Sequence, residues 1–142
     1  MSGRLVFPPR QGVLKQLRAN VRAAASRLGA KPGACDSLAL VVDELVNNAV
    51  EHGSVYRRKD LDLAIVIGDA GDRISIEFFD PEMPVSNIRD LARALAATSG
   101  DTPALDSERG RGLFLMSIYL ENLHADVAPA GGLRLQGLVK KR

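Results

Sequence analysis

Residues 38–53 constrain the fold most, because they combine the periodicity of a core helix with polar residues that such a helix normally lacks. The apolar residues recur at helical spacing, so one face of the predicted helix belongs to a hydrophobic core. Two adjacent asparagines, Asn47 and Asn48, interrupt this pattern, although asparagine is a poor helix former. The apolar positions that define the core face are Leu38, Val41, Val42, Leu45 and Ala49.

Glu44 and Asn48 lie four residues apart in this segment, which stacks a carboxylate and an amide on one side of the helix. One interpretation is a solvated helix face with capping chemistry near Gly53. The other is a carboxylate base beside an amide oxygen that holds a hard cation such as Mg²⁺. The local pattern leaves both interpretations open.

Size and composition predict a single globular domain over residues 1–142, because 46% of the chain is hydrophobic. The net charge is only +2, and the basic runs at residues 57–59 and 140–142 are only three residues long, so we do not expect nucleic-acid binding. One cysteine, Cys35, excludes an internal disulfide. The sequence has no leading apolar segment and no run of about 20 apolar residues, so we expect a cytoplasmic protein without a membrane span.

Helical and strand patterns alternate along the rest of the chain. We predict an α+β fold, a two-layer sandwich with helices on one face of a mixed, mostly antiparallel sheet, because hairpins join the alternating strands. The predicted helices are residues 11–28, 34–53, 87–97 and 112–123, and the predicted strands are residues 4–7, 61–67, 74–78, 123–128 and 133–140. A hairpin turn is predicted at residues 70–72 and a loop at residues 98–109.

Asp80 is the second informative residue, because it continues the parity of Ile74, Ile76 and Phe78 toward the covered side of the sheet. A carboxylate in that position needs a hydrogen-bond donor, since an unpaired buried charge is costly. The donor is either part of a capped turn at Pro81 or an amino group of a ligand, such as the exocyclic amine of adenine.

Gly110 and Gly112 precede a predicted helix and are separated by one residue. Glycines at this position let backbone amides approach a phosphate at the positive end of the helix, although a hinge would have the same sequence. The neighbouring Arg109 and Arg111 add charge that suits a polyphosphate, or they are simply solvated.

These residues, in this order, resemble the Bergerat-type (GHKL) ATP-binding fold: Glu44 and Asn48 on one helix, Asp80 at a strand end, and Gly110 and Gly112 beside a later helix. Within that superfamily the chain is similar to the bacterial anti-sigma factor serine/threonine kinases. The resemblance spans residues 5–140, and its most specific stretches are residues 43–53 and 110–116.

The resemblance implies a partner-switching regulator of transcription. Such a protein sequesters a sigma factor and phosphorylates a serine of an anti-anti-sigma (STAS-type) protein. ATP and Mg²⁺ are the implied cofactors, and a homodimer is the implied assembly. No direct contact with nucleic acid or a membrane is implied.

The resemblance also assigns roles to individual residues. Glu44 is the implied general base, Asn48 the implied Mg²⁺ ligand and Asp80 the implied acceptor for the adenine amine. Gly110 and Gly112 are expected along the phosphates, beneath a lid formed by residues 98–109. Further nucleotide contacts are implied for His52, Met83, Arg109, Arg111 and Leu113.

The chain departs from the family pattern at residues 80–84, where an aspartate is usually followed by two spaced glycines. Here Glu82 puts a side chain and a negative charge where backbone usually approaches the base. Glu108 replaces a frequent arginine, and Leu133 replaces a frequent threonine.

Two other classes of protein remain as alternatives. A non-catalytic binding module, which sequesters a regulatory partner with weak or no use of ATP, is favoured by the altered residues 80–84. The catalytic half of a sensor kinase is disfavoured, because neither His52 nor His124 lies on a helix upstream of the domain.

Overall fold

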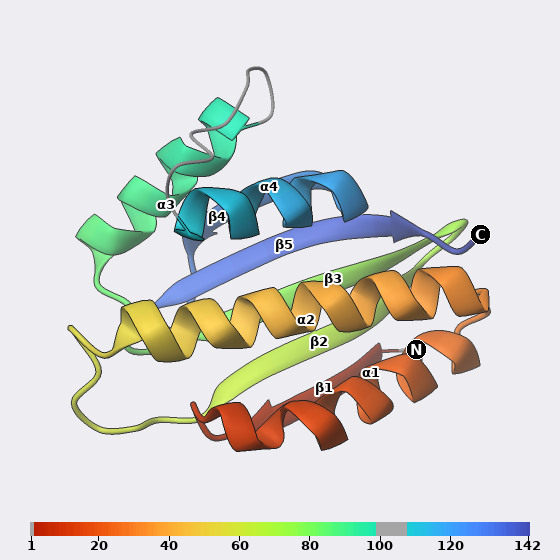
Figure 1. Cartoon of the computed structure of the whole chain (residues 1–142), viewed down its shortest axis with the longest axis horizontal. Helices are drawn as coiled ribbons and strands as arrows, with labels where there is room; N and C mark the ends of the chain where they lie inside the picture. The colour runs from red at the N-terminus through yellow and green to blue at the C-terminus, as the bar shows by residue number, and fades with distance from the viewer. Residues whose placement is uncertain (1, 99–107) are drawn as a thin grey trace.

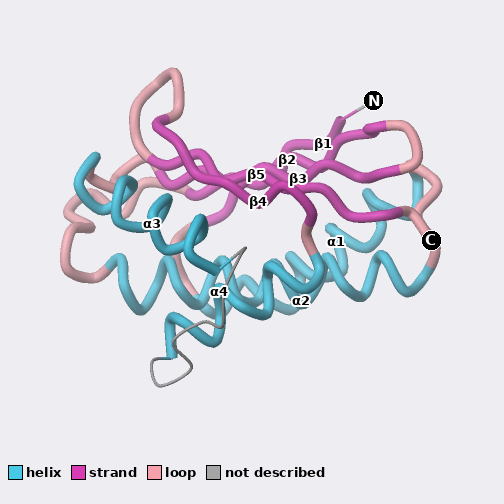
Figure 2. The backbone as a smooth tube through the Cα atoms, turned by 90° about the horizontal axis from the view of Figure 1, so that it is seen from above, coloured by secondary structure: helices cyan, strands magenta, loops and turns pink. Residues whose placement is uncertain are grey.

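The structure, a computed structural model, describes the backbone of residues 2–98 and 108–142 and the side chains of residues 3–97 and 112–142 (Figure 1). Seen from above, a sheet forms one layer and the helices lie together beneath one of its faces (Figure 2). The predicted two-layer α+β architecture is therefore confirmed. The helices are η1 (Gln11–Val13), α1 (Leu14–Arg27), α2 (Pro32–Gly53), α3 (Val85–Thr98) and α4 (Glu108–Tyr119). The strands are β1 (Ser2–Phe7), β2 (Leu63–Ala70), β3 (Arg73–Asp80), β4 (Glu121–Val127) and β5 (Leu133–Lys140).

The sheet has the strand order β1-β2-β3-β5-β4. Its four described pairings are all antiparallel, so the parallel pair that a mixed sheet requires is not found among the described strands. The predicted hairpin joins β2 to β3, and Gly71 adopts a positive φ of 77° at its turn. Glycine is favoured there because this backbone conformation is strained for residues with a Cβ.

Helix α2 runs along the sheet between α1 and α4, so its apolar face meets the strands and its flanks meet the two neighbouring helices (Figure 1). The predicted core face of α2 is confirmed, because all five apolar positions are buried. The inward side chains of β3 are buried as well, as the parity of the strand predicts. No helix in the described part of the chain is long and apolar enough to cross a membrane.

Helix α4 begins at Glu108, earlier than predicted, and ends at Tyr119. The two glycines therefore lie within the first turns of the helix. Glycine disfavours a helix by only about 1 kcal/mol. Burial of Leu113 and Met116 on the core side of α4 outweighs this preference. Residues 99–107 of the predicted lid lie outside the described residues.

Candidate functional site

The flank of α2 that faces α4 carries Glu44 and Asn48, both half-buried. Gly112 of α4 lies against them: a Cβ at Gly112 would lie 2.6 Å from the Glu44 Oε2 and 3.6 Å from the Asn48 Nδ2. The prediction that the carboxylate and the amide share one side of the helix is confirmed. A side chain at Gly112 would therefore displace the carboxylate of Glu44.

The position of the glycine pair corrects the prediction that both glycines precede the helix. Only the first four N–H groups of a helix lack an intrahelical partner. Because α4 begins at Glu108, the N–H of Gly110 belongs to this set and that of Gly112 does not. The side chains of Arg109 and Arg111 lie outside the described residues, so their phosphate contacts remain predictions.

The two asparagines of α2 have different surroundings. The side chain of Asn47 accepts a hydrogen bond from the Gln11 Nε2 at 3.2 Å, which ties η1 to α2. Asn48 instead lines a cavity of about 40 Å³ between α2, the sheet and α4. Asn47 therefore has a structural contact, whereas Asn48 is available to a ligand of the cavity.

The cavity beside Asn48 brings together four more residues that the resemblance assigned to the nucleotide: His52, Asp80, Met83 and Leu113. Its volume holds about three water molecules. A purine base fills more space than that, so a bound base would extend beyond this volume or displace side chains of the lining. The rest of the lining is largely apolar and consists of Leu45, Ala49, Tyr56, Phe78, Leu91, Met116, Leu133 and Leu135.

His52 lies in the last turn of α2, and its Nε2 is buried without a hydrogen-bond partner among the described residues. Buried polar atoms nearly always have such a partner, which is often water where protein provides none. Because His52 lines the cavity, its Nε2 is available to a polar ligand atom or a water molecule there. This unpaired atom fits the predicted nucleotide contact.

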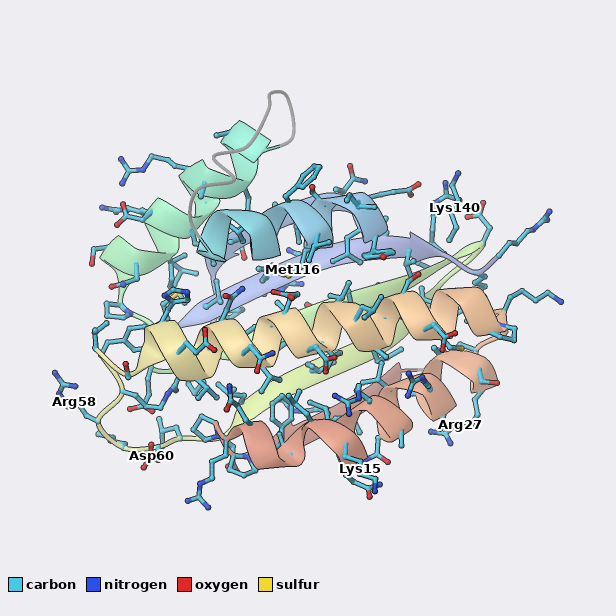
Figure 3. The ribbon with its side chains drawn as sticks, in the orientation of Figure 1. Lys15, Arg27, Arg58, Asp60, Met116 and Lys140 are labelled. Carbon is cyan, nitrogen blue, oxygen red and sulfur yellow. The ribbon has the colours of Figure 1, made fainter. Side chains whose placement is uncertain are left out.

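Glu44 lines a second cavity, of about 270 Å³, between α2 and α4. Leu40 and Leu115 on its walls are 50% and 42% exposed. Met116 lies between α4 and α2 and lines both cavities (Figure 3). Sequence reasoning missed this groove, because it depends on how the two helices pack. The remaining residues of its lining are Val41, Asp43 and Tyr119.

Asp80 ends β3 and is fully buried, as its parity predicts. Its Oδ2 accepts hydrogen bonds from the Tyr56 hydroxyl at 2.7 Å and from the Arg57 Nη2 at 2.8 Å. Its Oδ1 accepts from the Arg57 Nη1 at 3.2 Å and from the backbone N–H of Glu82 at 3.1 Å. A carboxylate offers about four acceptor positions, so donors of the protein itself occupy all of those on Asp80.

The guanidinium of Arg57 is the main partner of Asp80, and only 7% of its side chain is exposed. It also donates to the backbone oxygen of Ala49 at 3.2 Å and to the Glu82 Oε2 at 3.3 Å. Burial lowers the pKa of Arg57, but the hydrogen bond and the charge of Asp80 outweigh it and raise the pKa overall. A Cβ on Gly53 would lie 2.5 Å from the Arg57 Nη2, so α2 ends in a residue that leaves space for the guanidinium.

The ion pair between Arg57 and Asp80 is costly to break. Removing one member of a buried pair typically costs about 3–5 kcal/mol, because the other charge is left without a partner. One hydrogen bond to a charged group returns about 1.5–3 kcal/mol. The pair is therefore a stable feature of the cavity wall. Sequence reasoning missed Tyr56 and Arg57, because both lie in the irregular connection after α2.

Glu82 is turned toward that connection and does not line the cavity. Its Oε1 accepts from the backbone N–H groups of Arg58 and Lys59, and its Oε2 from that of Leu61. Burial raises the pKa of Glu82, but these three hydrogen bonds and the charge of Arg57 together lower the pKa to about 2. Its negative charge therefore stabilises the connection. The departure from the family pattern had suggested that this charge would face the base, but Glu82 does not line the cavity.

Asn48 is the candidate for a metal ligand in this site. The described residues contain no group of three or more histidine, cysteine, aspartate or glutamate side chains that could hold a metal. Mg²⁺ typically binds nucleotide-dependent enzymes through the phosphates of the substrate, water and one or two carboxylates, and amide oxygens also bind hard cations. The amide oxygen of Asn48, in the lining of the cavity, is the protein ligand that the site offers beside the phosphates.

The comparisons with known proteins agree with this geometry. Residues 7–133 match the histidine kinase-like ATPase domain family, and the chain belongs to this family. The resemblance to Bergerat-type ATP-binding proteins is thereby confirmed.

Among solved structures, a chain of "The crystal structure of SiaB-SiaC complex from Pseudomonas aeruginosa" is similar, with a TM-score of 0.72 and 16% identity. The alignment covers 95% of this chain and 88% of that chain, and at this identity it establishes a common fold. A comparison with curated proteins gave no match.

Proposed function

We propose that this protein is an anti-sigma factor and an ATP-dependent protein serine/threonine kinase. It sequesters a sigma factor and phosphorylates a serine of an anti-anti-sigma (STAS-type) protein, and so controls transcription by partner switching. The observation that carries the proposal is the pairing of Glu44 and Asn48 against Gly112, beside a cavity that contains the unpaired His52 Nε2.

Glu44 acts as the general base in this proposal. Its carboxylate lines the open groove between α2 and α4, where a serine hydroxyl of a partner protein can approach it. A base within hydrogen-bond reach of the hydroxyl accepts its proton as the oxygen attacks phosphorus. Most of the rate in phosphoryl transfer comes from such positioning and from neutralisation of charge.

Asn48 would hold Mg²⁺ through its amide oxygen, and the N–H groups in the first turn of α4 would contact the phosphates. Bound Mg-ATP supplies the phosphoryl group and neutralises charge on its oxygens. His52, Met83 and Leu113 would contact the nucleoside, since all three line the cavity next to Asn48.

Two observations support a protein partner. A similar solved structure is a complex of two named proteins. The groove beside Glu44 is also lined by the exposed apolar side chains of Leu40 and Leu115. A further apolar side chain of α4, Ile118, is 58% exposed. Exposed apolar patches are typical of protein-binding surfaces. We propose a sigma factor, a STAS-type protein and a second copy of the chain as partners.

The proposal is tested with the purified chain, Mg-ATP labelled at the γ-phosphate and a STAS-type protein. The wild type is expected to label a serine of that protein. Glu44→Gln preserves the shape of the side chain but cannot accept the proton, so the labelling rate should fall by about 10²-fold or more. Unchanged binding of ATP by the variant, measured by calorimetry, is the control. Labelling at the wild-type rate would remove Glu44 from the role of base.

A binding module without catalysis is the second candidate, and the contacts of Asp80 favour it. The predicted acceptor for adenine already has four donors of the protein itself. Calorimetry separates the two candidates: heat of binding at millimolar Mg-ATP supports the kinase, and its absence supports the binding module.

A further inference from the structure

The ion pair between Arg57 and Asp80 forms part of the nucleotide cavity but takes no part in the proposed phosphoryl transfer. Asp80 and Tyr56 line the cavity, whereas Arg57 does not. The pair therefore bears on which base the cavity accepts, and not on the chemistry at the phosphates.

We propose that Arg57 determines base selectivity in this protein: it withholds the Asp80 carboxylate from the ligand and so suppresses recognition of the exocyclic amine of adenine. The inference rests on the proposed function in one respect, namely that a purine nucleotide binds in this cavity. It departs from the role that the family resemblance gives to Asp80.

The geometry supports this role of Arg57, because donors of the protein itself occupy every acceptor position of Asp80. Two donors reach each carboxylate oxygen, and the two donors from Arg57 come from opposite arms of one guanidinium. An arginine fork of this kind binds both carboxylate oxygens at once, which a single amine cannot do. An entering amine would have to replace charge-assisted bonds with one ordinary hydrogen bond.

Arg57 is also held from its far side, so it does not move aside readily. The Ala49 backbone oxygen accepts from its Nη2, and the Glu82 carboxylate accepts from its Nη1. Glu82 is itself fixed by three backbone N–H groups of the connection after α2. Displacing the guanidinium would break this whole set of contacts.

Removal of the guanidinium should free one acceptor position on each oxygen of Asp80. The Tyr56 hydroxyl would still donate to Oδ2 and the Glu82 N–H to Oδ1. These two donors keep the carboxylate in place, and the remaining positions can accept an amine. A hydrogen bond from an amine to a charged carboxylate changes affinity by about 10- to 150-fold.

The experiment compares ATP with purine riboside 5′-triphosphate, which has the same ring without the exocyclic amine. The dissociation constants of both Mg-nucleotides are measured by calorimetry with the full chain, as wild type, Arg57→Met and Arg58→Met. Arg58 is the matched control, because it is the adjacent arginine and its side chain points away from the body of the protein (Figure 3).

The expected readout is the ratio of the purine riboside constant to the ATP constant. This ratio should rise about tenfold or more in Arg57→Met relative to the wild type, and it should not change in Arg58→Met. A structural role alone would weaken both nucleotides equally and leave the ratio constant. An unchanged ratio in Arg57→Met would therefore overturn the proposal.

Arg57→Lys provides a second variant in case Arg57→Met is too unstable to purify. Lysine keeps the charge but loses the fork, so the ratio should rise in the same direction by a smaller factor. A ratio in Arg57→Lys that is no higher than that of the wild type counts against the proposal. If neither nucleotide binds to the wild type or to the variants, the proposed function and this inference are both contradicted. If the nucleotides bind with a constant ratio, this inference alone is contradicted.

Discussion

At the scale of single residues, the site depends on where side chains are absent as much as on where they are present. Gly112 leaves space for the carboxylate of Glu44, and Gly53 leaves space for the guanidinium of Arg57. Neither glycine has a positive φ, so conformational freedom is not the reason for either. Close packing against a functional side chain explains both.

Gly112→Ala should therefore impair phosphoryl transfer without unfolding the protein. The new methyl group would overlap the Oε2 of Glu44, and the flexible end of that side chain must move away. Alanine favours a helix by about 1 kcal/mol over glycine, and this gain offsets the cost of moving the Glu44 side chain. The free energy of unfolding should therefore change little. The labelling rate of the partner protein, together with urea unfolding, measures the two effects.

Gly33→Ala is the matched control for that substitution. Gly33 also lies in a helix, and a Cβ there would meet nothing within 4 Å. It should leave the labelling rate unchanged. A normal labelling rate in Gly112→Ala would show that contact between the two helices does not position Glu44.

At the scale of elements, residues 58–61 of the connection between α2 and β2 are held by the carboxylate of Glu82. Glu82 accepts from three backbone N–H groups of residues 58–61 and from Arg57, and it lies just beyond the end of β3. The outer side chains of this connection, Arg58 and Asp60, point away from the body of the protein (Figure 3). A single residue of β3's terminal turn therefore orders a segment that is far from it in sequence.

Glu82→Gln should lower the free energy of unfolding by about 2 kcal/mol at neutral pH, because the charged acceptor is lost. The pKa of Glu82 is about 2 in the folded protein against an ordinary 4.5, so its contribution is present in full above about pH 4.5. It is lost as the pH falls toward about 2. Urea unfolding at pH 7 and pH 3 measures this dependence.

The wild type should lose more stability than Glu82→Gln between those two pH values, since the variant has no such group to protonate. Glu51→Gln, at an exposed position of α2, is the control and should behave like the wild type. Equal losses in the wild type and in Glu82→Gln would contradict the assigned role of Glu82.

At the scale of the whole molecule, the candidate site joins both layers of the sandwich. The cavity lining comes from α2, α3 and α4 on one side and from β3 and β5 on the other. A ligand that binds only this assembled arrangement stabilises the entire fold by mass action. Thermal unfolding is thus a direct measure of occupancy.

Mg-ATP at about 100 times its dissociation constant should stabilise the wild type by about 2.7 kcal/mol. Asn48→Ala should lose the part of this gain that depends on Mg²⁺, because the amide oxygen is the proposed ligand. The measurement is the shift in Tm with ATP, in the presence of Mg²⁺ and after its removal with EDTA.

Asn47→Ala provides the comparison, because its side chain contacts Gln11 and does not line the cavity. Its Mg²⁺-dependent shift in Tm should equal that of the wild type. An equal Mg²⁺-dependent shift in Asn48→Ala would exclude the amide as a metal ligand.

The sequence by itself determined the features that depend on periodicity. Helical spacing identified the buried face of α2 and set Glu44 and Asn48 on one side of it, and strand parity predicted that Asp80 would be buried. These predictions succeed because residues a few positions apart are related by the geometry of one element.

Only the tertiary structure decided which partners these residues have. Arg57 lies 23 positions from Asp80 in a connection without periodicity, so no local pattern could pair them. The two glycines likewise lie inside α4, where burial of Leu113 and Met116 outweighs the local preference of glycine. Long-range packing and charge pairing govern both features, and neither is encoded in the spacing of neighbouring residues.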